Sequence, residues 1–249
     1  MRLRRHWPAL ESERHRFPRR VSARASGKFD RVRFLVTAGP TREPIDPVRY
    51  ISNRSSGKMG YAIAEAALDA GHDVIVISGP VNIEPPGGAK LVSVSTSDEM
   101  FASVHRHADN CDVCVLCAAV ADYKPVKASR TKIKKRGAKF SLDLVPTRDI
   151  LDSLGHRQDR QFFLVGFAAE TNDMEENAAQ KLREKKCDIM VANDVSGANS
   201  AMESDVNEVT ILFQNGERQK ISCAPKKIIA RELVKIFQNS QQKCLTKKL

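Results

Sequence analysis

From Val32 onward, the chain alternates between segments with the pattern of buried strands and segments with the pattern of amphipathic helices. The strand patterns lie at residues 32–36, 73–78, 90–94, 113–118, 162–167 and 188–192. The helix patterns between them lie at residues 57–70, 97–108 and 172–186. The second of these helices is expected to be capped by Ser97 or Asp98. Such alternation predicts an α/β fold, in which right-handed crossovers join the strands of a doubly wound, Rossmann-like, mostly parallel sheet.

The last part of the folded region has a different pattern. Residues 208–213 and 218–221 flank the dipeptide Asn215-Gly216, which is typical of a tight hairpin turn. We therefore expect an antiparallel β ribbon attached to the sheet, followed by a last helix at residues 226–237. These boundaries predict a folded domain over residues 31–239 and a C-terminal tail over residues 240–249.

The net charge of +11 is concentrated in two segments. Residues 1–30 hold nine Lys or Arg against three acidic residues and show no sustained periodicity, so they are expected to form a basic, disordered or weakly ordered arm. An organelle transit peptide is the alternative, although Glu11 and Glu13 count against it. Residues 124–139 hold eight basic residues and no acidic residue. This distribution indicates an arm and an anion-binding segment rather than a groove for nucleic acid.

The apolar and cysteine residues limit where the protein acts. No window contains the about 18 uninterrupted apolar residues that span a bilayer, so no membrane association is expected. Six cysteines without a secretory segment favour a reducing compartment and a cytoplasmic protein. Cys111, Cys114 and Cys117 have iron–sulfur spacing. They lie in a strand pattern in which Cys114 would point away from the other two, so they are expected to be small buried side chains.

The segment between Phe34 and Met59 contains a strand end and a helix start. The first predicted strand ends in TAGP (residues 37–40), and SSGKMG (residues 55–60) opens the next helix. Backbone N–H groups and the helix dipole at such a start favour a bound phosphate. The segment matches neither GxxxxGK[ST] nor GxGxxG. A glycine-bearing cap on an ordinary α/β unit is the alternative.

Three further segments are expected at the same edge of the sheet, because ligands of doubly wound sheets bind beyond the carboxyl ends of the strands. Asp122 follows small residues in AAVADY (118–123), where it is a proton acceptor or a solvated loop residue. Lys132 lies in TKIKK (131–135), whose cations would offset charge on a leaving pyrophosphate unless the run is merely solvated. Phe167 would form a wall for a base or sugar, or else belong to the core. Lys181 and Lys185 share one helix face, as surface lysines also do.

The chain contains, in this order, the motifs TAGPTREPIDPVRYISNRSSGKMG, AAVADYKP, KIKK and VGFAAET. With them it resembles the phosphopantothenate–cysteine ligase family of coenzyme A biosynthesis, over about residues 33–237. The bacterial form of this family is the synthetase half of a bifunctional decarboxylase/synthetase. Because the flavin-binding decarboxylase half is not among these residues, the resemblance favours a stand-alone bacterial synthetase, with a separate decarboxylase as a partner.

The resemblance implies an activity in two steps. A nucleoside triphosphate activates the carboxylate of 4′-phosphopantothenate, giving an acyl-nucleotide and pyrophosphate, and the amine of L-cysteine then displaces the nucleotide. The KIKK and NRSSGKMG motifs resemble the bacterial type, which uses CTP rather than ATP. We therefore expect an acyl-cytidylate intermediate, Mg²⁺ as the accompanying ion and a homodimer.

The resemblance also implies roles for individual residues. Asn53 would hold the carboxylate and the acyl intermediate, and Lys132 would act from a flap during activation. The implied nucleotide-binding residues are Gly39, Ser55, Gly57, Gly60, Asp122, Lys132, Asp149, Phe167, Lys181 and Lys185. The implied substrate-binding residues are Arg49, contributed by the partner subunit, and Asn53, Ala118, Ala119 and Asp122. No metal ligands are predicted.

Two other classes of protein fit the sequence less well. A nicotinamide dehydrogenase would need an acidic residue at the end of the second strand, where ISGP (77–80) offers none. A nucleic-acid-binding protein would need aromatic residues among its basic ones. The chain has three tyrosines and one tryptophan, and Trp7 lies in the arm.

Overall fold

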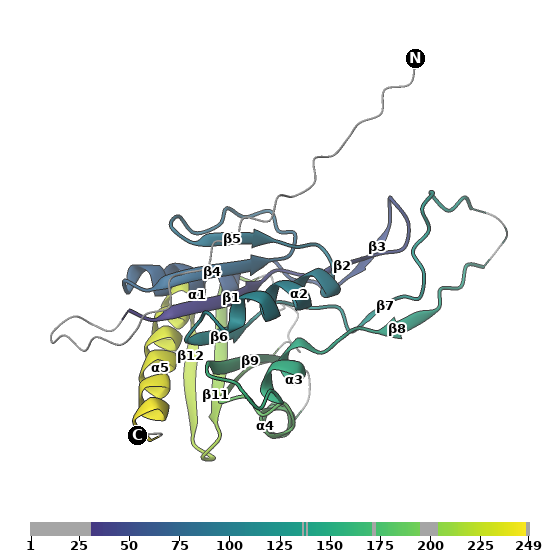
Figure 1. Ribbon diagram of the computed structural model, residues 1–249. Helices are drawn as coiled ribbons and strands as arrows, with labels where there is room; N and C mark the ends of the chain where they lie inside the picture. The colour runs from purple at the N-terminus through teal and green to yellow at the C-terminus, as the bar shows by residue number, and fades with distance from the viewer. Residues whose placement is uncertain (1–30, 136, 138, 171–172, 195–203, 248–249) are drawn as a thin grey trace.

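The computed structural model describes residues 31–135, 137, 139–170, 173–194 and 204–247 (Figure 1). The basic arm predicted at residues 1–30 lies outside these ranges. Within them, helices cover both faces of an eight-stranded sheet, as the alternating pattern predicts.

The sheet has the strand order β12-β11-β10-β9-β6-β1-β4-β5. The parallel strands are β1 (Arg33–Ala38), β4 (Asp73–Ser78), β5 (Lys90–Ser93), β6 (Val113–Leu116), β9 (Phe163–Glu170) and β10 (Ile189–Asp194). The antiparallel strands β11 (Val206–Phe213) and β12 (Arg218–Pro225) extend the sheet beyond β10. The predicted fold class, a mostly parallel Rossmann-like sheet with an attached antiparallel ribbon, is confirmed.

The two faces of the sheet carry separate cores. The helices α1 (Lys58–Asp69) and α5 (Lys226–Lys247) pack on one face, and α2 (Ser97–Ala108), α3 (Ile150–Gly155) and α4 (Met174–Glu184) pack on the other. Successive residues of β1 alternate between them, since Phe34 belongs to the first core and Leu35 to the second. Burial on both faces explains why the strands read as continuous apolar runs.

Two details of the helices differ from the prediction. The cap of α2 is Thr96 and not Ser97 or Asp98: its side chain accepts from Glu99 N–H, and the Glu99 carboxylate accepts from Thr96 N–H, which makes a capping box. The predicted end of the last helix at Phe237 is too early, because α5 continues to Lys247. The extension is polar, so apolar periodicity could not mark it.

Two short antiparallel ribbons were not predicted. In one, β2 (Arg42–Pro44) pairs with β3 (Tyr50–Ser52), and in the other β7 (Tyr123–Pro125) pairs with β8 (Leu144–Pro146). Strands of three residues are too short to show a period of two. Both ribbons project away from the sheet (Figure 1), and residues 126–143 between β7 and β8, called the lysine loop below, carry the basic block.

The three cysteines of the predicted strand are small buried or partly buried side chains, as expected. The predicted orientation of Cys111 relative to Cys114 was wrong. Cys111 and Cys114 belong to the same core, because Cys111 precedes β6 and does not follow its alternation, whereas Cys117 packs on the other face. Burial raises the pKa of the Cys111 thiol to about 12. Among the described residues, no cluster of His, Cys, Asp and Glu suits a metal ion, and no helix is long and apolar enough to cross a membrane.

Candidate active site

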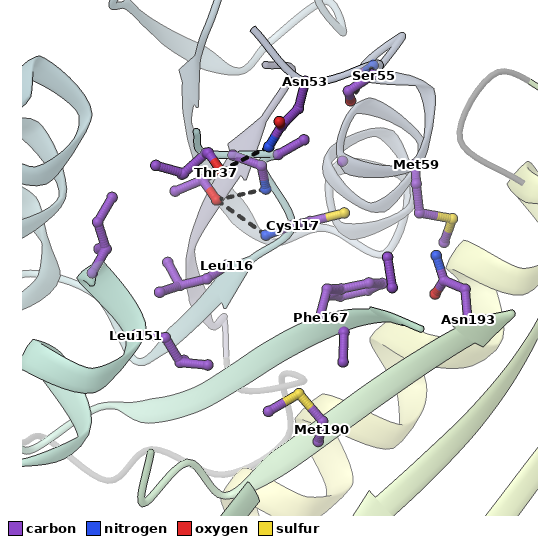
Figure 2. A pocket seen from close by; sticks show the side chains of 18 of the residues that line it. Thr37, Asn53, Ser55, Met59, Leu116, Cys117, Leu151, Phe167, Met190 and Asn193 are labelled. Atoms are coloured by element: carbon purple, nitrogen blue, oxygen red, sulfur yellow. Dashed lines mark hydrogen bonds between the residues drawn. The ribbon is translucent and has the colours of Figure 1, made fainter. Parts of the chain in front are cut away.

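A cavity of about 530 Å³ lies at the carboxyl ends of the parallel strands. Its wall combines the start of α1 and the residues before it, the segment after β6, residues of β9, β10 and α4, and the starts of α3 and α5 (Figure 2). Most of the residues that the sequence singles out line it: Asn53, Ser55, Gly57, Gly60, Ala118, Ala119, Asp122, Asp149, Phe167, Lys181 and Lys185. Of the four segments predicted to share one edge of the sheet, three contribute to this cavity, and the segment that contains Lys132 does not.

The start of α1 depends on glycine backbone geometry. Gly57, the N-cap of α1, and Gly39 both have left-handed φ angles, 75° and 73°. A Cβ on Gly60 would lie 2.7 Å from the Cβ of Ala38, so only glycine lets α1 approach β1 this closely. Since Gly57 has no side chain, it caps none of the first-turn N–H groups of α1. This arrangement suits a phosphate. Gly39 itself supports the turn behind the cavity wall, where its carbonyl accepts from Ala119 N–H.

Two side chains position a second part of the cavity wall, which is the backbone that follows β6. The Thr37 hydroxyl accepts from the N–H groups of Cys117 and Ala118, at 3.0 and 3.1 Å, and fixes the backbone after β6 (Figure 2). Asn53 donates from Nδ2 to the carbonyl of Val120 at 2.9 Å. Asn53 is therefore not the cap of α1, and its amide lies beside the small residues expected to bind substrate.

The opposite part of the wall is apolar with cations at its border. Phe167 from β9, Leu151 from α3 and Met190 from β10 all line it (Figure 2). Lys185 pairs with Asp149 at 3.0 Å and Asp152 at 3.3 Å. Burial would lower the pKa of Lys185, but the two carboxylates outweigh it and raise that pKa. A wall that combines an aromatic ring and a thioether with Lys181 and Lys185 suits a nucleobase and its ribose.

Seven cavity residues with polar side chains were not predicted as site residues: Thr37, Lys58, Thr147, Arg148, Asn193, Asn207 and Lys226. Lys58 and Lys226 are the first residues of α1 and α5, and the two asparagines lie near the end of β10 and the start of β11. In a sequence, a lysine or asparagine at the end of a helix or strand cannot be told from an ordinary surface residue. Only the tertiary structure reveals that these boundaries meet at one place.

Lys132 and Arg49 do not line the cavity. Lys132 is exposed on the lysine loop, and Arg49 lies between β2 and β3. The two segments are joined by Asp46, whose fully buried side chain accepts from Ile133 N–H at 3.1 Å and from Arg49 Nη1 at 2.6 Å. Arg49 Nη1 also donates to the carbonyl of Ile133 at 3.2 Å, and Ser129 N–H donates to the carbonyl of Ile45. Asp46 therefore anchors the lysine loop one residue away from Lys132.

Asp46→Asn is expected to loosen the lysine loop, because an amide NH₂ would then face the two donors on Ile133 and Arg49. Losing hydrogen bonds to a charged acceptor costs about 1.5–3 kcal/mol each, so tryptic cleavage after Lys132 and Lys134 should accelerate about tenfold or more. Asp143→Asn is the control, since it makes the same charge change at an exposed position of the same loop. Equal cleavage rates in both variants would show that Asp46 does not anchor the loop.

Residues 29–240 match the family model described as the DNA/pantothenate metabolism flavoprotein C-terminal domain. The chain is 42% identical over 206 residues to the coenzyme A biosynthesis bifunctional protein CoaBC of Vibrio vulnificus (strain CMCP6), covering 82% of this chain and 51% of that protein. The chain thus spans about half the length of the curated relatives it matches. Those relatives are bifunctional proteins, and not the stand-alone type expected from the sequence.

Solved structures show the same fold. A crystal structure of the C-terminal domain of the coenzyme A biosynthesis bifunctional protein CoaBC matches with a TM-score of 0.73 and 42% identity, covering 85% of this chain and 96% of that one. A Cab2 variant in complex with phosphopantothenate-cysteine matches with a TM-score of 0.70, covering 86% of this chain and 89% of that one. At 18% identity, this second likeness shows the fold alone.

Proposed function

The chain belongs to the family of the DNA/pantothenate metabolism flavoprotein C-terminal domain, and from this premise we propose that it is a phosphopantothenate–cysteine ligase. It joins 4′-phosphopantothenate to L-cysteine with CTP as co-substrate and forms 4′-phosphopantothenoylcysteine in coenzyme A biosynthesis. The observation that carries the proposal is the single cavity on which a glycine-built helix start, an apolar wall and the Asn53 amide converge.

In the first step, a carboxylate oxygen of phosphopantothenate attacks the α-phosphorus of CTP. A bond to pyrophosphate breaks, and an acyl-cytidylate forms. Asn53 donates to the reacting carboxylate from beside Ala118 and Ala119. The N–H groups at the start of α1, with Ser55 and Gly57, receive phosphate oxygens. Lys132 offsets the negative charge that grows on the leaving pyrophosphate.

In the second step, the amine of cysteine attacks the acyl carbon, CMP leaves, and the amine loses a proton as the amide forms. The substrate supplies its own nucleophile, so the protein needs no serine or cysteine for covalent catalysis. The Cys117 thiol at the cavity wall suits this scheme, since burial raises its pKa to about 12 and keeps it unreactive.

The residues present fit Mg²⁺ brought by the nucleotide. In proteins this ion keeps several waters and binds one or two carboxylates together with substrate phosphates. Asp122 on the cavity wall offers such a carboxylate, and a preformed cluster of three acidic, His or Cys ligands is absent from the part of the chain that the structure describes. When bound, Mg²⁺ would neutralise phosphate charge; Asp122 would hold it and could also contact the ribose.

The proposal includes a cytoplasmic homodimer. Arg49 lies outside the cavity of its own chain, at the tip of the projecting β2–β3 ribbon. That position suits a residue contributed to the cavity of a partner subunit. A separate or fused decarboxylase would consume the product.

Pyrophosphate release is the test of the proposed reaction. We expect release only when phosphopantothenate, Mg²⁺ and a nucleotide are all present, with CTP turned over faster than ATP, and amide formation only when cysteine is added. Turnover with ATP at an equal or higher rate would overturn the assignment of CTP. No turnover with any nucleotide would overturn the assignment as a ligase.

A further inference from the structure

Lys226 is a buried lysine on the cavity wall. Its exposed fraction is 5%, which is unusual for this residue type, and it is the first residue of α5. Burial and the positive charge of Lys58 both lower the pKa of Lys226. A cation in such surroundings is stabilised by an anion beside it.

A second cation and two helix starts lie at the same part of the wall. Lys58 is the first residue of α1, and α1 and α5 pack against each other in one core. Their amino-terminal ends therefore both direct positive partial charge at the cavity. Asp205 is one counter-charge, at 2.6 Å from Lys58 Nζ, and its side chain is 85% exposed.

Asn207 adds a donor that points to a ligand independently. Its exposed fraction is 4%, and it lines the same cavity. Its Oδ1 accepts from Glu208 N–H at 3.0 Å, which identifies the other amide atom as the nitrogen. Among the described residues, Nδ2 of Asn207 is one of the few buried side-chain atoms without a hydrogen-bond partner. An unsatisfied buried donor beside two cations matches an anionic acceptor.

We propose that Lys226 and Asn207, with Lys58, form an anion subsite that binds a phosphate group of the nucleoside triphosphate. The subsite rests on the proposed function for the identity of its ligand. It adjoins the start of α1, where Ser55 and Gly57 are expected to receive phosphate oxygens, so one polyphosphate can contact both sets of donors. A polyphosphate carries several negative charges and therefore pairs with more cations than the single carboxylate of cysteine does. Two lysines at one part of the wall thus favour phosphate over that carboxylate.

The test is calorimetric binding of inorganic pyrophosphate, and separately of CTP with Mg²⁺, to the full chain. Lys226→Met and Asn207→Asp should each weaken binding of both probes about tenfold or more, because charge-assisted hydrogen bonds contribute strongly. Lys227→Met is the matched control for the first variant, since the neighbouring Lys227 is exposed and pairs with Glu65. Asn215→Asp is the control for the second, because Asn215 Oδ1 accepts a backbone N–H in the same way within an exposed turn. Both controls should bind like the wild type.

Thermal unfolding separates a binding role from a structural one. Lys226→Met keeps most of the length of the side chain and removes only its charge, so the variant should stay cooperatively folded while binding is lost. If Lys226→Met lowers both the unfolding temperature and the affinity for the probes, while a folded Asn207→Asp variant binds them like the wild type, the subsite is overturned. Pyrophosphate binding by Lys226→Met at wild-type affinity would also overturn it, as would failure of the wild type to bind pyrophosphate.

Kinetic measurements distinguish this inference from the proposed function. If the wild type binds pyrophosphate through Lys226 but catalyses no ligation, the subsite stands and the ligase assignment fails. If ligation proceeds and Lys226→Met raises the KM for cysteine or phosphopantothenate while that for CTP is unchanged, the phosphate assignment is overturned.

Discussion

Lys132→Gln is expected to abolish pyrophosphate release while the protein stays folded. The variant removes the positive charge that is proposed to offset the growing charge of the leaving group, and losses of this kind lower rates by roughly a hundredfold or more. The side chain is exposed on the lysine loop, so the free energy of unfolding should change by no more than about 0.5 kcal/mol. Release of pyrophosphate in the presence of phosphopantothenate, measured with and without cysteine, reports the effect directly.

The matched control is Lys127→Gln, which removes the same charge from another exposed position of the lysine loop. It should retain near wild-type turnover. If both variants lose activity equally, the loop acts only through its overall charge. If Lys132→Gln turns over at the wild-type rate, Lys132 has no part in the reaction.

Because Lys132 lies outside the cavity of its own chain, mixing variants can identify the cavity it serves. Lys132→Gln and Asn53→Asp subunits, each deficient in amide formation when alone, should regain amide formation when mixed if the lysine reaches across a dimer. No recovery in mixed dimers would place Lys132 over the cavity of its own subunit, carried there by motion of the lysine loop.

Asn53→Asp is expected to separate the two half-reactions, with accumulation of acyl-cytidylate. Asn53 Nδ2 donates to the carbonyl of Val120, and an ionised aspartate would set a carboxylate oxygen against that carbonyl and beside an anionic substrate. The acyl-nucleotide would then be misplaced for attack by cysteine, so conversion should slow more than activation does. Mass spectrometry of the quenched reaction measures the intermediate and the product.

Asn53→Ala separates loss of the donor from addition of charge. A defect shared by both variants assigns the effect to the missing amide, whereas a defect in Asn53→Asp alone assigns it to charge. A role in capping α1 is already excluded, because the cap is Gly57, four positions further along the chain. Normal product formed at the normal rate by both variants would remove Asn53 from the mechanism.

The elements that the sequence predicts well are those whose own pattern determines them. β4 was predicted at its observed bounds, since DVIVIS is a continuous apolar run between a turn and a Gly-Pro pair. The ribbons β2–β3 and β7–β8 were missed because three residues cannot show periodicity. The cap of α2 was misplaced by one or two positions because Thr96, Ser97 and Asp98 are all good capping residues, and only the capping box with Glu99 decides among them.

The cavity was predicted in part for the same reason. Asp122 lies beyond the end of β6 and Phe167 in the second half of β9, so topology alone brings them to one edge. Lys226 and Asn207 could not be found this way, because their role depends on α5 packing against α1 and β11, and α1 is more than a hundred residues away in sequence. Asp46 was missed because its partner Ile133 lies on an irregular loop, whose path no local pattern determines.

The position of α5 has a consequence for synthesis of the protein. α5 follows all the strands of the sheet along the chain, yet its first residue completes the wall of a cavity whose other parts begin with β1. On the ribosome, the start of α1, which is proposed to bind phosphate, emerges long before Lys226 does. A nascent chain would therefore hold an open and incomplete pocket until α5 docks on α1. If the cavity binds a nucleotide as proposed, binding requires the completed fold, and by mass action the nucleotide favours that state over every earlier one.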